Sequence, residues 1–334
     1  MGCALRDLTE EPARPLRLAG QALAGIALGR TLLRRGIEHL HVHFAHAPAT
    51  VGMYAAAYAG IPFSVTGHAN DLYVHPQLLR AKLRRATPFA TISEENRRFL
   101  LRELGAVAAR VKLVRCGVDT ERFQPHGARD DVPLVFSTGR LVPKKGLDLL
   151  LKSLARVVTP WRCVIAGDGP QHAELQRLAR RLGIARRVRF LGAVDTATVR
   201  SYLRRAHVFV LPCRQAADGD IDGIPVALME AMAMEVPVVS TRVSGIPELI
   251  EDRVSGRLVA PENTLELTYA ISEILACSEH ARSLGRAARA KVAAEFDLHR
   301  NARRLAGAFQ TEARAASPLR IETRLGVASP NTPA

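Results

Sequence analysis

The feature that most constrains this chain is a regular alternation of two short patterns between residues 133 and 241. Short apolar runs, each closed by glycine, proline or a polar residue, alternate with segments that carry leucine at helical spacing. Runs that are apolar throughout are typical of strands buried on both faces, as in a parallel sheet covered by helices. We therefore predict an α/β fold with a doubly wound parallel sheet, whose ligands would lie beyond the carboxyl ends of the strands.

The predicted elements of this half follow one another closely. Strands are expected at 133–141, 163–169, 188–192, 207–212 and 237–241, and helices at 147–158, 175–182, 195–203 and 226–235. The first of these helices should bury one face from Leu147 to Val158. Asp195 is placed to N-cap the third helix, and Pro225 suits the first turn of the fourth.

The first 130 residues show the same alternation more weakly. Helices are expected at 16–35, 49–60, 77–86 and 94–104, and strands at 39–44, 61–66, 89–93 and 111–115. The polar loop at 127–131 separates an N-terminal domain at 1–130 from a C-terminal domain at 131–311, whose last helix could cross back. The segment 312–334 is rich in Ala, Ser, Pro, Thr and Arg, and we predict a disordered tail there.

Composition narrows the possible functions. The formal net charge is +15, from 47 Lys and Arg against 32 Asp and Glu, which suits nucleic acid, an anionic membrane or anionic substrates. The five cysteines form no Cys-x-x-Cys pair, so neither a zinc knuckle nor a disulfide framework is indicated, and a reducing cytoplasm is expected. Because no run of 18 apolar residues occurs, we predict no transmembrane helix.

Two segments after predicted strands could hold a diphosphate and sugar hydroxyls. The first is Gly139-Arg140-Leu-Val-Pro-Lys-Lys145-Gly146, where Arg140 and Lys145 flank a turn that leads into a helix. Cations on such a turn can reach one pair of phosphates. An ordinary exposed basic loop is the alternative, and the two glycines favour a shaped loop instead.

The second segment is Asp222-Gly223-Ile224-Pro225-Val-Ala-Leu-Met-Glu230. Asp222 would lie in a loop near a helix N-terminus, and Glu230 would follow on the helix. Both carboxylates can face one cleft if the loop folds over the helix. The alternative is one loop acid and one surface acid, but a glutamate within an Ala/Leu/Met run is unusual for a buried face.

Two further patterns imitate metal sites. Asp218-Gly-Asp220 and Asp220-Ile-Asp222 resemble Asp-x-Asp, and His39-x-His41-x-His43-x-x-His46 places three histidines on one face of a strand. The acids are interpreted as ordinary loop residues. The histidines are a metal comb or, in the plainer interpretation, the polar face of a strand at the cleft rim, with His43 and His46 near an acceptor.

Four motifs in order give a specific resemblance over about residues 39–305. They are the Gly139–Gly146 segment, Ala166-Gly-Asp-Gly-Pro170, the Asp222–Glu230 segment running on through Pro237-Val-Val-Ser-Thr241, and Ser244-Gly-Ile-Pro-Glu248, and Thr66-Gly-His68-Ala-x-Asp71 narrows the resemblance further. Together they resemble the retaining family-4 glycosyltransferases (glycosyl transferases group 1), nearest to bacterial exopolysaccharide enzymes of the colanic acid and amylovoran type. The resemblance implies the GT-B fold, in which two Rossmann-like domains face a cleft.

The resemblance also implies roles in hexose transfer from a nucleotide-diphosphate sugar. Glu230 would hold the ribose, Arg140 and Lys145 the diphosphate, and Asp222 with the backbone of residues 223–225 the sugar. Asp222 stands where the family usually has a glutamate, which is one methylene longer. His68 would reach the sugar or phosphate from the facing domain, on the acceptor side with His43, His46 and Asp71.

Transfer in this family retains configuration, and the favoured scheme is front-side attack without a protein nucleophile. Neither a metal nor any other cofactor is expected, since the nucleotide sugar is a substrate. The acceptor would be a polysaccharide or a polyprenol-linked glycan, with the protein cytoplasmic and in peripheral contact with an anionic inner membrane.

One departure from the family concerns the N-terminal domain. Its first predicted strand is at 39–44, and no Gly-Gly turn precedes it, so we expect a shortened domain. A donor-binding partner subunit without activity is therefore an alternative. A basic nucleic-acid-binding protein is a second alternative, although aromatic platforms and a helix-turn-helix pattern are missing. An NAD-type enzyme ranks low because no Gly-x-Gly-x-x-Gly follows a strand.

Overall fold

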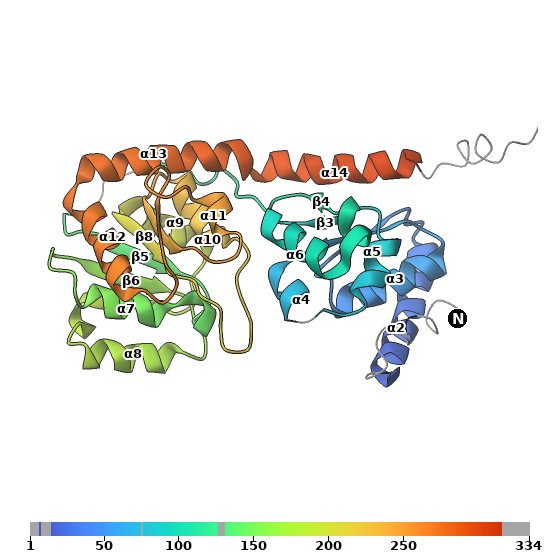
Figure 1. The fold of residues 1–334 in the computed structure, drawn as a ribbon, viewed down its shortest axis with the longest axis horizontal. Coiled ribbons are helices and arrows are strands. Elements are labelled where there is room, and N and C mark those ends of the chain that lie inside the picture. The colour runs from blue at the N-terminus through green and yellow to red at the C-terminus, as the bar shows by residue number, and fades with distance from the viewer. Residues whose placement is uncertain (1–6, 8–14, 75, 126–130, 316–334) are drawn as a thin grey trace, which may run out of the picture.

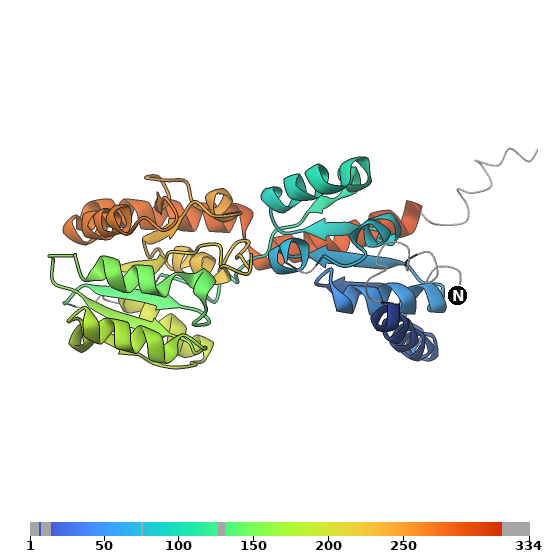
Figure 2. The ribbon, with the colours of Figure 1, turned by 60° about the horizontal axis from the view of Figure 1, so that its bottom comes forward.

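A computed structural model describes residues 7, 15–74, 76–125 and 131–315. Two lobes lie side by side, each with helices on both faces of a sheet (Figures 1 and 2). The predicted α/β class with parallel sheets is confirmed. Most of the predicted boundary loop and the predicted tail beyond Ala315 lie outside the described residues. Among the helices that are described, none is long and apolar enough to cross a membrane.

The described part of the N-terminal domain contains a four-stranded parallel sheet in the order β1-β2-β3-β4. Its strands are β1 (Leu40–His43), β2 (Phe63–Gly67), β3 (Phe89–Thr91) and β4 (Lys112–Leu113). Its helices are α2 (Pro15–Arg34), α3 (Ala47–Ala59), α4 (Ala69–Tyr73), α5 (Leu79–Arg85), α6 (Glu94–Leu104) and η1 (Gly105–Arg110). Each predicted strand and helix of this half is therefore present, with ends shifted by a few residues.

The described part of the C-terminal domain contains a six-stranded parallel sheet in the order β10-β9-β8-β5-β6-β7. Its strands are β5 (Leu134–Thr138), β6 (Arg162–Ala166), β7 (Val188–Phe190), β8 (Val208–Leu211), β9 (Val238–Thr241) and β10 (Arg257–Val259). Its helices are η2 (Pro143–Lys145), α7 (Leu147–Leu154), α8 (His172–Arg181), η3 (Ala185–Arg187), α9 (Thr196–Arg205), α10 (Val226–Ala233), α11 (Ile246–Leu249), α12 (Thr264–Ala276) and α13 (Ser278–Glu295).

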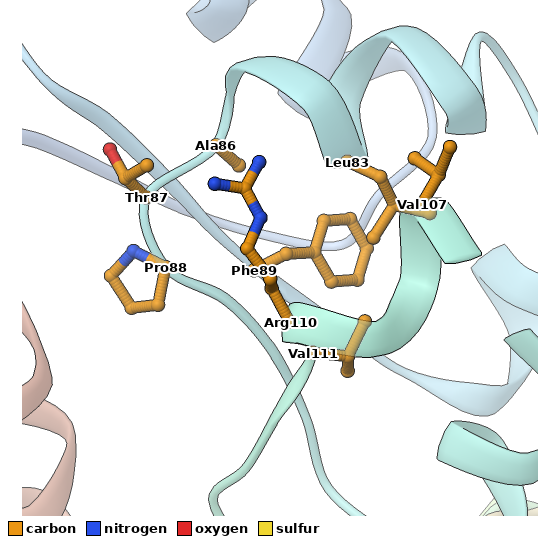
Figure 3. A pocket seen from close by; sticks show the side chains of 8 residues that line it. All are labelled: Leu83, Ala86, Thr87, Pro88, Phe89, Val107, Arg110 and Val111. Atoms are coloured by element: carbon orange, nitrogen blue, oxygen red, sulfur yellow. The ribbon is translucent and has the colours of Figure 1, made fainter. Parts of the chain in front are cut away.

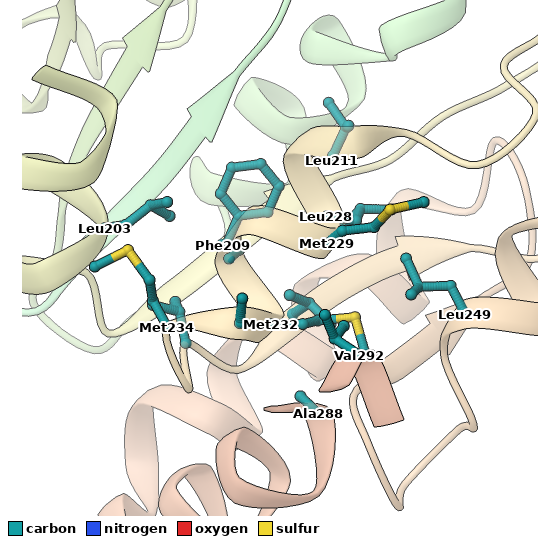
Figure 4. Close-up of a cluster of buried hydrophobic side chains, with 14 of the residues drawn as sticks. Leu203, Phe209, Leu211, Leu228, Met229, Met232, Met234, Leu249, Ala288 and Val292 are labelled. Atoms are coloured by element: carbon teal, nitrogen blue, oxygen red, sulfur yellow. The ribbon is translucent and has the colours of Figure 1, made fainter. Parts of the chain in front are cut away.

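Burial of both faces of this sheet can be read from neighbouring residues of β5. Val135 packs into a core with α7, α8 and α12, whereas Phe136 packs into a second core with α9, α10 and α13. Successive side chains of a strand point to opposite faces, so both cores need apolar residues and the strand carries no polar alternation. Figure 4 shows the second core, which includes Phe209 of β8, Met229 and Met232 of α10 and Val292 of α13.

Two details of the predicted helices are corrected by the structure. The helix from Leu147 ends at Leu154, so the expectation that Val158 lies on its buried face is wrong, and Val158 is 95% exposed. Pro225 is the N-cap of α10 rather than a residue of its first turn. The Asp195 cap is confirmed, because its carboxylate accepts a hydrogen bond from the Thr198 N–H at 2.8 Å.

The last helix, α14 (Leu298–Ala315), crosses back over the N-terminal domain (Figure 1). At its start, Leu298 N–H donates to the carbonyl of Val118, and Asn301 donates to the carbonyl of Cys116. Farther along, the Phe309 ring lies 4.8 Å from the ring of His39 and 4.9 Å from that of His41. Both lobes are therefore joined by α14 as well as by the chain between them.

Candidate functional site

The site forms where strand order reverses in the C-terminal sheet. The central strand β5 pairs with β6 on one side and with β8 on the other, so the loops after β5 and β8 leave the same edge at neighbouring places. We call residues 139–146 the basic loop and residues 213–222 the acidic loop. Their backbones are joined where Arg214 N–H donates to the Lys144 carbonyl at 2.9 Å.

Glycines give the basic loop its shape. Gly139 has φ +151° and Gly146 has φ +62°, conformations that side-chain-bearing residues rarely adopt. A Cβ atom at Gly146 would lie 2.0 Å from the carbonyl oxygen of Pro212, directly after β8. A side chain at position 146 would therefore push the basic loop off the strand that precedes the acidic loop.

The two loops meet through partly buried ion pairs. Lys145 Nζ lies 2.7 Å from one carboxylate oxygen of Asp222, and Lys144 Nζ lies 3.5 Å from the other. Each of these three side chains is 14% exposed. Burial works to lower the pKa of Lys145, but Asp222 outweighs it and raises that pKa overall. The lysine therefore stays charged in a partly dry site, where an anion would be attracted strongly.

Arg140 and Cys213 complete the surroundings of this pair. Arg140 is exposed, and its charge opposes protonation of Lys145, so both cations act on the same small volume. The Cys213 thiol is buried 3.5 Å from Asp222, and burial raises the pKa of that thiol well above its usual range. Cys213 is therefore a neutral donor to the carboxylate rather than a nucleophile.

Glu230, the second acidic residue of the Asp222–Glu230 segment, lies on α10 and is not part of the core. Leu228, Met229, Ala231, Met232 and Ala233 are all fully buried, while Glu230 is half-buried. Burial raises the pKa of Glu230 from 4.5 to about 7, and the charge of Arg122 counteracts part of this. No hydrogen bond or ion pair to the Glu230 carboxylate occurs among the described residues. An unpaired acid with a perturbed pKa is typical of a binding site.

The backbone between the two acids touches the other domain. Gly223, Ile224 and Pro225 are buried, and a Cβ atom on Gly223 would lie 3.2 Å from Ile92 and 3.5 Å from Ala69. The segment that follows the acidic loop therefore runs along the N-terminal domain, directly at the start of α4.

The facing wall carries the predicted histidines. His43 is the last residue of β1, and His68 directly follows β2. Because the two strands are neighbours, Nδ1 of His43 lies 3.3 Å from Nε2 of His68. Burial, aided by His43, lowers the pKa of His68, and Asp71 opposes the change. His46 stacks on the ring of Phe44 at 5.8 Å. His68 is thus a neutral imidazole at neutral pH, able to donate or accept a hydrogen bond.

Asp71 is fully buried beneath this wall. Its carboxylate accepts the His68 N–H at 2.9 Å and also the Ala45 N–H, and so holds the loops after β1 and β2 together. Lys82, also fully buried, donates to the carbonyls of Ala45 at 2.6 Å and His46 at 3.0 Å. Asp71 and Lys82 fix the backbone that carries the three histidines.

The two patterns that imitate metal sites have other partners. His39 and His41 each bond the hydroxyl of Ser64 at 2.7 Å, and His41 also bonds Thr66 at 3.0 Å. Asp220 pairs with Lys144 at 2.9 Å. In the described part of the chain, no three His, Cys, Asp or Glu residues are grouped so that they could hold a metal ion.

Sequence reasoning missed two residues of the site. In the sequence, Lys144 is one residue of the basic run, and no motif singles it out. Asn70 lies between His68 and Asp71, and its residue type gives no signal of a site. Asn70 donates to Asp220 at 2.9 Å across the two domains. A small pocket elsewhere, lined by Leu83, Phe89 and Arg110 among others, shares none of these residues (Figure 3).

Comparison with known proteins identifies the family of the chain. The sequence model described as Glycosyl transferases group 1 matches residues 118–291, and that of Glycosyltransferase Family 4 matches residues 5–122. The amylovoran biosynthesis glycosyltransferase AmsK of Erwinia amylovora is 39% identical over 210 residues, which cover 61% of this chain and 51% of that protein. A second relative is the GDP-mannose-dependent phosphatidylinositol monomannoside mannosyltransferase of Mycolicibacterium smegmatis. It is 36% identical over 52% of this chain and 49% of that protein.

Solved structures share the fold. Sucrose-phosphate synthase from Thermosynechococcus elongatus superposes with a TM-score of 0.76 at 24% identity, over 87% of this chain and 77% of that one. Anabaena HepE in complex with UDP-glucose gives 0.72 at 20% identity, over 85% and 82%. Both N- and C-terminal domains are covered by these matches, whereas the alignments with the two curated relatives named above span about half of each relative's length.

Proposed function

Because this chain belongs to the family of glycosyl transferases group 1, we propose that it moves a hexose from a nucleotide-diphosphate sugar to a polysaccharide or lipid-linked oligosaccharide, with retention of configuration. The observation that carries the proposal is the meeting of Lys145 and Asp222 at the strand-order reversal, and the unpaired acid Glu230 follows Asp222 on α10. One such site offers a cation for phosphate and carboxylates for hydroxyl groups.

The residues then have distinct roles. Arg140 and Lys145 hold the diphosphate and stabilise the negative charge of the departing nucleotide, which is expected to be the largest contribution to rate. Glu230 holds the ribose, and Asp222 with the backbone of 223–225 holds the hexose hydroxyls. Asp222 pairs with Lys145 in the structure, and a diphosphate would share that lysine.

The proposed reaction uses these residues. An acceptor hydroxyl attacks the anomeric carbon from the side on which the phosphate leaves, the carbon–phosphate oxygen bond breaks, and the departing phosphate oxygen takes the hydroxyl proton. His68 contacts the sugar or phosphate, and His43 and His46 line the acceptor side. Asp71 contributes by holding these loops. The proposed reaction needs neither a metal nor another cofactor.

The first experiment finds the donor and tests the phosphate role. Thermal shift across UDP-, GDP- and ADP-sugars identifies the base, since named relatives or structures involve GDP-mannose and UDP-glucose. Calorimetry with UDP and GDP then compares Lys145→Ala and Glu230→Ala with wild type. Loss of a charged hydrogen bond predicts a 10- to 100-fold weaker Kd, from roughly 1.5–3 kcal/mol. Lys152→Ala, an exposed lysine on α7, is the control. Unchanged affinity in Lys145→Ala would refute the assignment.

A lipid-linked acceptor places the protein at the inner face of the cytoplasmic membrane. Helix α2 supports this, because it exposes Leu16 and Leu23, carries Arg17 and Arg34, and contains no acidic residue. Apolar and basic residues on one helix suit an anionic bilayer surface. We predict co-sedimentation with phosphatidylglycerol vesicles at low salt, weakened about tenfold by Leu23→Glu.

Two controls accompany the vesicle experiment. Leu265→Glu changes an equally accessible leucine, which lies on α12 of the other domain, and should leave binding intact. Phosphatidylcholine vesicles should bind weakly. Equal loss in both leucine variants would argue against α2 as the contact surface.

A further inference from the structure

A partly buried polar contact joins the two domains at the acidic loop. One carboxylate oxygen of Asp220 accepts a hydrogen bond from the Asn70 amide at 2.9 Å and from Lys144 Nζ at 3.0 Å, and the other oxygen lies 2.9 Å from Lys144. The Asp220 side chain is 19% exposed and that of Lys144 14%. Three segments of the chain thus converge on one carboxylate.

The acidic loop presents this carboxylate from a closed turn. Ala216 N–H donates to the Asp220 carbonyl at 2.9 Å, and Asp220 N–H donates to the Asp218 carboxylate at 3.0 Å. Gly219 between them has φ +83°, which suits a tight reversal. Asp220 is therefore held in place by the loop's own backbone and is directed at Asn70 without help from a ligand.

Each partner of Asp220 adjoins a residue of the proposed reaction. Asn70 lies in α4, two residues after His68, and Lys144 precedes Lys145. Asp222 follows two residues after Asp220. Gly223, packed on Ile92 and Ala69, is a second contact between the same two surfaces. A shift of α4 relative to the acidic loop would separate His68 from the ion pair of Lys145 and Asp222.

We propose that Asp220 is a positioning residue that locks the acidic loop to α4 through Asn70 and to the basic loop through Lys144. The lock sets the distance between the acceptor-side histidines and the phosphate-binding lysine before any substrate arrives. The proposal rests on the proposed function for its catalytic consequence, whereas the contact itself can be tested without a substrate.

The experiment exchanges the two groups. Asn70→Asp opposes two carboxylates, and Asp220→Asn removes the charge that Lys144 needs. The double variant Asn70→Asp/Asp220→Asn restores one carboxylate facing one amide across the two domains, and Lys144 keeps its ion pair with Asp222. Hydrogen–deuterium exchange of amides 214–223 is the readout, and loss of one charged hydrogen bond predicts exchange about 10- to 100-fold faster. We expect this in Asn70→Asp and near-wild-type protection in the double variant.

Matched controls remove similar groups elsewhere. Gln176→Ala deletes an exposed side-chain amide of α8, and Glu174→Gln removes an exposed carboxylate of the same helix. Both should leave the exchange of 214–223 unchanged. The proposal is overturned if the amides 214–223 of the double variant exchange hydrogen as fast as those of the faster-exchanging single variant. It is also overturned if the single variants show the hydrogen exchange of wild type.

Activity separates this inference from the proposed function. With the donor found by thermal shift, Asn70→Asp should lower kcat more than it raises KM, and the double variant should recover kcat. If no nucleotide binds, yet the double variant restores protection, the lock stands and the proposed function fails. If nucleotide binds, but the substitutions change neither the hydrogen-exchange protection nor kcat, the proposed role of Asp220 is wrong and the proposed function stands.

Discussion

At the scale of single residues, Glu230 combines a location in an otherwise buried helix with an unusual acidity. Burial raises its pKa from 4.5 to about 7, so the unfolded chain loses this proton at lower pH than the folded protein does. Stability contributed by the bound proton is complete below pH 4.5 and is lost as pH rises through about 7. The fold therefore tolerates an ionised Glu230 at a cost, as expected of a residue kept for binding.

We predict that Glu230→Gln raises the free energy of unfolding at pH 8 by roughly 2 kcal/mol relative to wild type, so that the variant unfolds at a higher urea concentration. This gain should vanish near pH 4.5. The neutral amide avoids the burial of charge. Urea unfolding at four pH values between 4.5 and 8 measures it. Glu174→Gln, on an exposed position of α8, is the control and should show no such trend. Parallel curves for Glu230→Gln and wild type would contradict the shifted pKa.

At the scale of elements, the loop between β1 and α3 is fixed by two fully buried charged side chains. Asp71 accepts its Ala45 N–H, and Lys82 donates to its carbonyls at Ala45 and His46. A third bond joins Lys82 to the carbonyl of Gln77 at 2.6 Å. The side chains that bear the proposed acceptor chemistry thus depend on a lysine that is itself fully buried.

Lys82→Met should therefore destabilise the protein by about 2–4 kcal/mol, because buried carbonyls would lose their donor. Urea unfolding monitored by circular dichroism gives the change. Lys152→Met, which breaks an exposed pair with Asp148, should cost well under 1 kcal/mol. A Lys82→Met protein as stable as the Lys152→Met protein would show that the loop is held by other contacts.

At the scale of the whole molecule, a second carboxylate joins the domains. Glu248 of α11 accepts the backbone N–H groups of Glu94 and Glu95, each at 2.9 Å, in the first turn of α6, and it pairs with Arg115 at 2.5 Å. An acid at a helix N-terminus satisfies backbone donors and favours the helix dipole. The Glu248 contacts, α14 and the Asp220 contact together set how the domains face each other.

We predict that Glu248→Gln loosens the domain arrangement, since an amide has one acceptor oxygen and no charge for Arg115. The expected loss is about 1–3 kcal/mol of contact energy, seen as a larger radius of gyration in X-ray scattering and faster proteolysis between the domains. Glu251→Gln, exposed three residues later, should match wild type. Identical scattering of Glu248→Gln and wild type would mean that α14 and the Asp220 contact hold the domains without Glu248.

Much of the architecture could be predicted because strand and helix periods are local properties. Residues such as Val135 and Phe136 had to be apolar on both faces of a parallel sheet, and the predicted strands up to Thr241 are all present. The end of α7 could not be predicted, since leucine spacing continues to Val158 although the helix stops at Leu154. Asn70 was missed because a lone amide gives no pattern.

What the sequence determined by itself is the set of local pieces: the buried strands, the glycines that shape the basic loop, the charged residues after the strands and the motifs of the family. What only the tertiary structure decided is which pieces meet. Strands β5 and β8 lie about 70 residues apart in the chain yet pair side by side, and that places Lys145 on Asp222. Likewise β1 beside β2 brings His43 to His68. Strand order depends on long-range packing of whole helices and sheets, which no local pattern encodes.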